Sequence, residues 1–191
     1  MIQRFVTIVL LIIISLFGCT SLQAATRQEI ADRLAEQADQ YSRQIGKQYL
    51  AIPYINKAIE LQPKRTDLYY KRAFIFGRAG RYGNAINEFN KFVNNRKYPH
   101  AIRFRADCFM ALGMFQNAAK DYTIFLRFDP KDGKVWSYLT EALALMGRKY
   151  LALGAAEKGL ATGSHWSKRL NELKRKILLG ENITPHKPLS N

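Results

Sequence analysis

The segment Gly80-Arg81-Tyr82-Gly83-Asn84-Ala85-Ile86 recurs in outline three more times along this chain. A glycine occurs about every 34 residues, and an alanine follows each glycine after about five residues. The glycines are Gly46, Gly80, Gly113 and Gly147, and the alanines are Ala51, Ala85, Ala118 and Ala152. Each glycine separates two stretches with apolar residues at helical spacing. The period predicts stacked helical hairpins, in which glycine forms the turn and alanine lets two helices approach closely.

A second small or apolar position follows each turn glycine after about twelve residues, consistent with the same period. Its members are Ala58, Phe92, Phe125 and Gly159. Pro63 and Pro130 follow predicted second helices, and proline at that point ends a helix. Pro53 is compatible with a straight helix only in the first turn, so we expect that helix to begin near Leu50 or to be kinked.

This pattern resembles the tetratricopeptide repeat, a helix–turn–helix of about 34 residues. The resemblance covers about residues 30–163, and its best single match runs from Trp136 through Ala142 to Gly147. It implies an all-α fold, a right-handed superhelical array of about four hairpins. It also implies a protein-binding scaffold without enzymatic activity of its own.

The residues after the repeats predict a further helix over 164–180. Trp166, Leu170, Leu173 and Ile177 recur at helical spacing. Arrays of this type need a terminal helix with a polar outer face, so we expect a cap. Contact of its basic residues with anionic lipid is the alternative. Residues 181–191 are expected to form a disordered tail.

The first 18 residues have the pattern of an export signal, with Arg4 before an apolar run. The run ends in Leu16-Phe17-Gly18-Cys19, which resembles the lipobox of bacterial lipoproteins. The resemblance implies cleavage before Cys19, a lipid anchor with acyl chains such as palmitate on that residue, and sorting to the outer membrane. Cleavage near Ala24-Ala25, which leaves a soluble periplasmic product, is the alternative. Residues 19–29 would be a linker to the repeats.

No set of residues indicates catalysis, a metal site or a cofactor. His100, His165 and His186 fall on separate elements without the spacing of metal ligands. Cys108 lies in an apolar helical stretch, which is typical of a buried thiol. An enzyme built from residues far apart in the sequence is the third and weakest hypothesis.

The expected binding site is the face formed by the first helix of each hairpin, where the resemblance places partner peptides. The corresponding residues are Arg33, Glu36, Gln40 and Arg43 in the first repeat, Asp67, Tyr70, Phe74 and Arg78 in the second, His100, Arg103, Asp107 and Met110 in the third, and Lys134, Ser137 and Glu141 in the fourth. For Tyr70 and Phe74 the alternative is packing between repeats. The carboxylate clamp of some family members is absent at the matching positions, so an adaptor for chaperone tails is not expected.

The net charge is +15, which in a cytosolic protein would first suggest nucleic acid. The export signal makes nucleic acid an unexpected partner. We therefore expect a scaffold that holds other envelope proteins through a peptide or helix in its groove. The alternative is a charge-driven module that binds anionic lipid, lipopolysaccharide or another polyanion.

Overall fold

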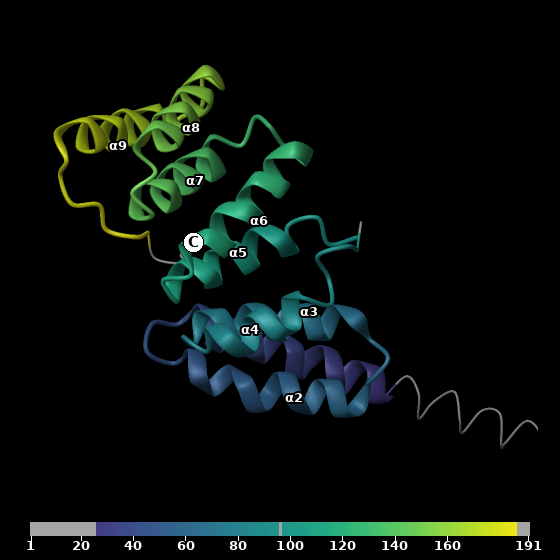
Figure 1. Ribbon diagram of the computed structural model, residues 1–191. Helices are drawn as coiled ribbons and strands as arrows, with labels where there is room; N and C mark the ends of the chain where they lie inside the picture. The colour runs from purple at the N-terminus through teal and green to yellow at the C-terminus, as the bar shows by residue number, and fades with distance from the viewer. Residues whose placement is uncertain (1–25, 96, 187–191) are drawn as a thin grey trace, which may run out of the picture. The chain divides into compact units, whose positions relative to one another are not determined.

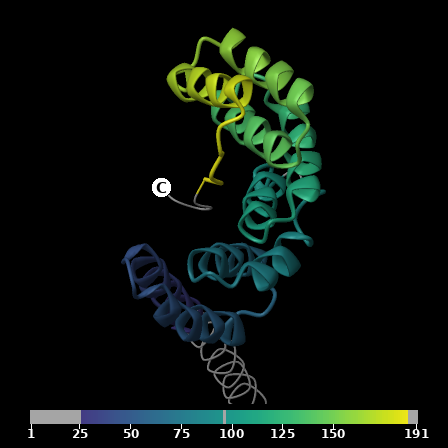
Figure 2. The same cartoon turned by 60° about the vertical axis from the view of Figure 1, so that its left-hand side comes forward.

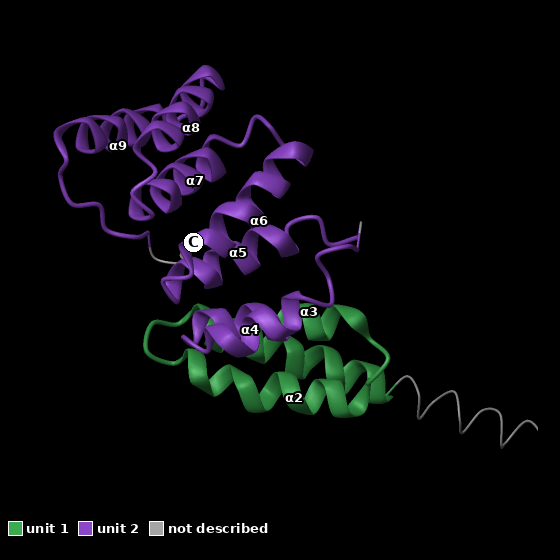
Figure 3. Ribbon diagram, in the orientation of Figure 1, with its two compact units in different colours: residues 1–71 green, residues 72–191 purple. Residues whose placement is uncertain are grey.

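The computed structural model describes residues 26–95 and 97–186. The chain divides into two compact units, residues 1–71 and 72–191, and each is described by itself (Figure 3). The predicted signal peptide and the Cys19 lipidation site lie outside the described residues. Within the described part no helix is long and apolar enough to cross a membrane.

The first unit contains a helix over residues 26–43, a short 3-10 helix η1 (Gln48–Leu50), α2 (Ala51–Leu61) and the beginning of α3 (Thr66–Arg78). The first helix starts inside the expected 19–29 linker. Pro53 falls in the first turn of α2, as expected, because a proline there loses no intrahelical hydrogen bond. The rings of Tyr41 and Tyr54 stack with centroids 5.3 Å apart.

The second unit continues α3 and adds six helices in hairpin order (Figure 1). These are α4 (Tyr82–Phe89), α5 (Ala101–Ala111), α6 (Phe115–Phe128), α7 (Gly133–Leu145), α8 (Lys149–Ala161) and α9 (Ser167–Leu179). Each helix from α4 to α8 packs against the next one along the chain, and α4 contacts α5 across the 90–100 connection. The described residues contain helices and no strands, so the all-α class is confirmed for them.

All four periodic glycines lie in turns with a positive φ, between 70° and 79°. A side chain at such a backbone angle would be strained, which explains glycine at each turn. The four alanines that follow them are fully buried, at 0% exposure. The period seen in the sequence therefore marks the turn and a fully buried alanine in every hairpin.

Helix α9 covers the last hairpin, and it contacts both α8 and α7. Leu170, Leu173 and Ile177 form its buried face, and Gly180 ends it with a φ of 71°. Helix α8 is continuous through Gly154 and Gly159. A β-carbon at Gly159 would lie 2.7 Å from Cβ of Trp136, so this glycine allows α8 to approach both neighbours.

Of the expected disordered tail, the structure describes residues 181–186, and residues 187–191 lie outside the described residues. Residues 181–186 turn back from the end of α9 toward the middle helices of the second unit (Figures 1 and 2). His186, at the end of this segment, has a side chain only 7% exposed. The physical reason is a pair of buried carboxylates that receive its imidazole ring.

Candidate functional site

The structure divides the expected binding residues into an exposed group, an interior group and a pocket. Arg33, Glu36, Gln40 and Arg43 are exposed on the first helix. Met110 and Ser137 are buried, and the Ser137 hydroxyl donates to the carbonyl of Lys134, so these two belong to the interior.

Phe74 belongs to an aromatic cluster. Its ring centroid lies 5.5 Å from that of Phe89 and 4.2 Å from that of Phe104, both edge-on. This geometry supports the alternative of packing for Phe74. The other members of the expected set on α3 and α5 are half-buried or exposed: Asp67, Tyr70, Arg78, His100 and Arg103.

Two expected residues, Asp107 on α5 and Glu141 on α7, are brought together in one pocket. Asp107 is 4% exposed and Glu141 is 0% exposed. The hydroxyl of Tyr122, on α6, donates to Asp107 at 2.7 Å. Buried carboxylates need hydrogen-bond or charge partners, so a side chain that occupies this pocket stabilises Asp107 and Glu141 in their buried positions.

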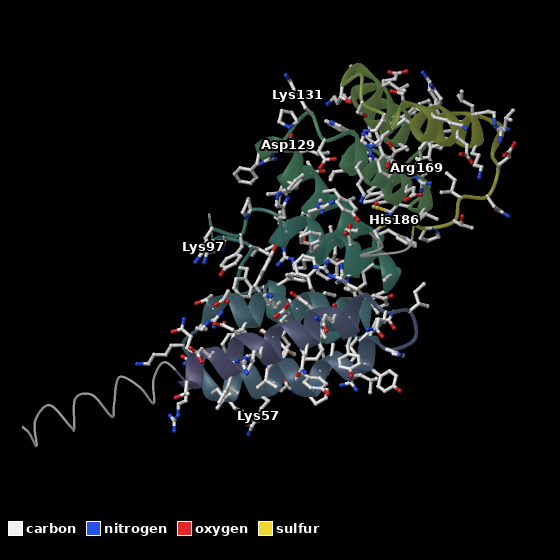
Figure 4. The ribbon with its side chains drawn as sticks, turned by 180° about the vertical axis from the view of Figure 1, so that it is seen from behind. Lys57, Lys97, Asp129, Lys131, Arg169 and His186 are labelled. Atoms are coloured by element: carbon white, nitrogen blue, oxygen red, sulfur yellow. The ribbon has the colours of Figure 1, made fainter. Side chains whose placement is uncertain are left out.

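The occupant is His186 of the chain's own tail, and Figure 4 labels it together with Arg169. His186 Nδ1 lies 2.6 Å from Oε2 of Glu141, and Nε2 lies 3.7 Å from Oδ1 of Asp107. The imidazole ring stacks on Tyr138 with centroids 3.6 Å apart and planes inclined by 5°. Nε2 also lies 3.4 Å from the Tyr122 hydroxyl, so the side chain is hydrogen-bonded at Nδ1, in polar contact at Nε2 and stacked on one face. We call Asp107, Tyr122, Tyr138 and Glu141 the acidic pocket.

Helix α9 contributes Arg169, whose guanidinium donates to Oε1 of Glu141. Between α7, α9 and the tail lies a cavity of about 300 Å³, lined by Glu141, Arg169, Glu172, Leu173, Lys176 and residues 183–186. The Lys134 ammonium lies 5.8 Å from the ring centroid of Tyr138 and 5.6 Å from that of Trp166. The acidic pocket is therefore part of a wider polar surface on α7 and α9.

The titration of His186 reflects two opposed effects. Burial lowers the pKa of its imidazole, and the hydrogen bonds and charges of Asp107 and Glu141 raise it by more, so the pKa lies above its ordinary value. Burial first and Asp107 second raise the pKa of Tyr122 well above its usual range, so its hydroxyl remains a donor. The pocket therefore favours a cation and keeps its tyrosine neutral.

Sequence reasoning did not find Tyr122, Tyr138, Arg169 or His186 as site residues. Tyr122 lies on a second helix, Arg169 on the cap and His186 in the tail, so the repeat register could not indicate them. Within the described residues no group of His, Cys, Asp and Glu could hold a metal ion.

A second missed feature did leave a signal in the sequence. Arg72 on α3 is paired with the buried Glu88 on α4, and Arg105 on α5 with the buried Asp121 on α6. Each arginine lies eight residues before a turn glycine, and each acid lies eight residues after it. We call these two ion pairs the hairpin pairs.

Comparisons with known proteins are consistent with this architecture. No family model matches the chain. Serine/threonine-protein phosphatase 5 of Rattus norvegicus is 29% identical over 137 residues, which is 71% of this chain. The same protein from Homo sapiens and from Mus musculus is equally similar. The match covers 26% of these relatives, so the chain spans about a quarter of their length.

Among solved structures, the crystal structure of MamA protein aligns with a TM-score of 0.63 at 18% identity. The alignment covers 77% of this chain and 79% of that chain. This likeness shows a shared helical fold. Together with the turn glycines and the hairpins, it supports a tetratricopeptide type of fold for this chain.

Proposed function

We propose that this chain is a protein-interaction scaffold of the bacterial cell envelope. It would bind an extended segment or a helix of a partner protein on the face formed by the first helices of its hairpins. The observation that carries this proposal is the acidic pocket, where two such helices already bind a side chain of an extended segment, residues 183–186. Extended-segment binding by a helical array requires such a face.

The envelope location rests on the sequence of residues 1–19. We propose that Cys19 carries a lipid anchor and that the mature protein faces the periplasm, with attachment to the outer membrane. Cys19→Ala is expected to release the protein from the membrane fraction or to stop its maturation. Cys108→Ala is the control and should keep membrane attachment, because Cys108 is buried inside α5. Equal membrane attachment and processing of the Cys19→Ala protein would contradict the anchor.

Site-specific photocrosslinking in cells tests the scaffold function. A photoreactive amino acid replaces Arg103 or Lys134, which lie on first helices next to the acidic pocket. The control replaces Lys120, an exposed residue of the second helix α6. We expect crosslinks to one or a few envelope proteins from the first two positions and not from Lys120. Identical crosslinks from all three positions, or none, would contradict the proposal.

A further inference from the structure

The two buried carboxylates of the acidic pocket have one basic side chain from the helices as a direct partner, Arg169. Glu141 accepts from Arg169 through one oxygen and contacts His186 through the other. Asp107 accepts from the neutral Tyr122 hydroxyl and has no direct arginine or lysine partner among the described contacts. Among these direct contacts the guanidinium of Arg169 pairs with Glu141 alone, so Asp107 is left without a cationic partner from the helices. Uncompensated buried charge is unfavourable, so the pocket selects a cationic side chain.

The shape of the pocket favours an imidazolium ring. Tyr138 provides a flat surface 3.6 Å from the ring centroid, and the two carboxylates lie at opposite edges of the ring. A protonated imidazole has one N–H donor at each of these edges. A lysine ammonium has no plane to stack on Tyr138, so it satisfies fewer of these contacts.

The tail is held mainly through this one side chain. Glu181, Asn182, Thr184 and Pro185 are exposed, and Ile183 is half-buried. Glu181 is paired with Arg175, but both side chains are largely exposed, and such pairs contribute little. A segment bound through one residue can be displaced by another segment that offers the same side chain.

We propose that the acidic pocket recognises a protonated histidine on an extended partner segment, and that His186 occupies it as an internal competitor until the partner displaces the tail. This inference rests on the proposed function and identifies the chemistry of the partner.

The exchange depends on pH. The groups around His186 are Asp107 and Arg103 on α5, Tyr122 on α6, Lys134, Tyr138 and Glu141 on α7, and Arg169, Glu172 and Lys176 on α9. A group with a raised pKa stabilises its bound state below its free pKa, and the effect is lost as the pH rises through the raised value. Both the tail and a histidine-bearing partner are therefore bound in mildly acidic solution and released on alkalinisation.

A peptide-binding measurement with the full chain tests the proposal. The probe is a fluorescent peptide with the sequence of residues 180–191, and binding is followed by anisotropy at mildly acidic pH. The His186→Ala chain is expected to bind the probe about tenfold or more tightly than the wild-type chain, whose own tail competes. A probe with alanine at position 186 is expected to bind at least about tenfold more weakly, since charge-assisted hydrogen bonds are lost.

Matched variants identify the pocket. In the His186→Ala chain, Asp107→Asn and Glu141→Gln should each weaken probe binding, whereas Glu157→Gln, an exposed carboxylate on α8, should not. A chain with His165→Ala in place of His186→Ala should bind the probe as weakly as the wild-type chain, because its own tail still occupies the pocket. Circular dichroism at each step verifies that the helices are intact.

A scrambled probe that keeps its one histidine decides whether a partner can be recognised. Binding within about threefold of the native order would show recognition of the side chain, in line with its single-residue anchoring. No binding of the scrambled probe would mean that the pocket accepts only the tail, and would overturn the inference. Equal binding by wild-type and His186→Ala chains would do so too. Either failure leaves the crosslinking result unaffected, because that experiment reports on the whole first-helix face.

Discussion

Two kinds of glycine occupy the hairpins, and they act in different ways. Gly46, Gly80, Gly113 and Gly147 are needed for their backbone angle, with open space around the missing side chain. Gly159 has helical geometry and is needed for space, because Trp136 and Leu170 lie against it. Helix propensity alone would assign a weakening effect to both glycines of α8, but it leaves out the close approach of Trp136 and Leu170 at Gly159.

Substitution at Gly159 tests this distinction. Gly159→Ala improves helix propensity, but its new β-carbon would lie 2.7 Å from Cβ of Trp136 and 2.8 Å from Cδ1 of Leu170. We expect a net loss of about 1–3 kcal/mol in the free energy of unfolding, because overpacking forces neighbours to move. The matched control is Gly154→Ala in the same helix, where nothing lies within 4 Å, with an expected gain of up to about 1 kcal/mol. Urea denaturation measures both, and a stabilised Gly159→Ala protein would contradict the packing argument.

Cys108 illustrates how burial controls the chemistry of one residue. Burial, with the charge of Asp107 as the second cause, raises the pKa of its thiol to about 12. The thiol therefore stays protonated through neutral and mildly alkaline pH, and only the thiolate is an effective nucleophile. In the Cys19→Ala protein we expect no reaction with a thiol-specific reagent near pH 8 until denaturant is added. Rapid labelling of the folded protein would mean that α5 opens readily.

At the scale of the helical element, the hairpin pairs join the two helices of a repeat. Arg105 donates to both oxygens of Asp121, at 2.7 and 2.8 Å, and the Asp121 side chain is 3% exposed. The next repeat has Leu139 and Ala155 at the same two positions, both in its apolar core. The contact between the two helices of a hairpin at these positions is therefore ionic in one repeat and apolar in the next.

This comparison gives a double-mutant prediction for α5 and α6. Arg105→Leu leaves Asp121 buried without its partner, and we expect a loss of about 3 kcal/mol in the free energy of unfolding. The double variant Arg105→Leu/Asp121→Ala copies the residues of the following repeat and should recover most of that loss, to within about 1 kcal/mol of the wild type. Urea denaturation of the wild type, both single variants and the double variant measures the coupling. Additive losses would show that the pair makes no specific contribution.

The elements were more predictable from sequence than the site, for a physical reason. Turn glycines and helix-contact alanines act locally and recur with the repeat, so their period was visible. His186 acts through contacts with Asp107 and Glu141, which lie far away in sequence, and nothing near Pro185-His186 marks such a contact. Asp107 and Glu141 were found because they occupy repeat positions, but their burial and their shared occupant required the structure.

At the scale of the whole molecule, the net charge of +15 raises the alternative of a polyanion-binding module. Several basic residues have acidic partners within the described residues, among them Arg65, Arg105, Arg169 and Lys174. Positive charge still exceeds negative charge by a wide margin, so attraction to anionic surfaces is expected. The question is whether that attraction or the acidic pocket determines which partner is bound.

Dependence on salt separates the two mechanisms. We expect binding of the wild-type chain to vesicles rich in phosphatidylglycerol to fall steeply between about 50 and 300 mM salt, since exposed charges are screened over about 10 Å or less. Binding of the 180–191 probe to the His186→Ala chain should fall much less, because buried ion pairs are screened weakly. Glu141→Gln should weaken probe binding and leave vesicle binding unchanged, as that carboxylate is 0% exposed. The contrary outcome is that probe binding declines as steeply with salt as vesicle binding does, and is unchanged by Glu141→Gln. In that case long-range charge would account for the binding of both the probe and the vesicles, and specific recognition in the acidic pocket would be excluded.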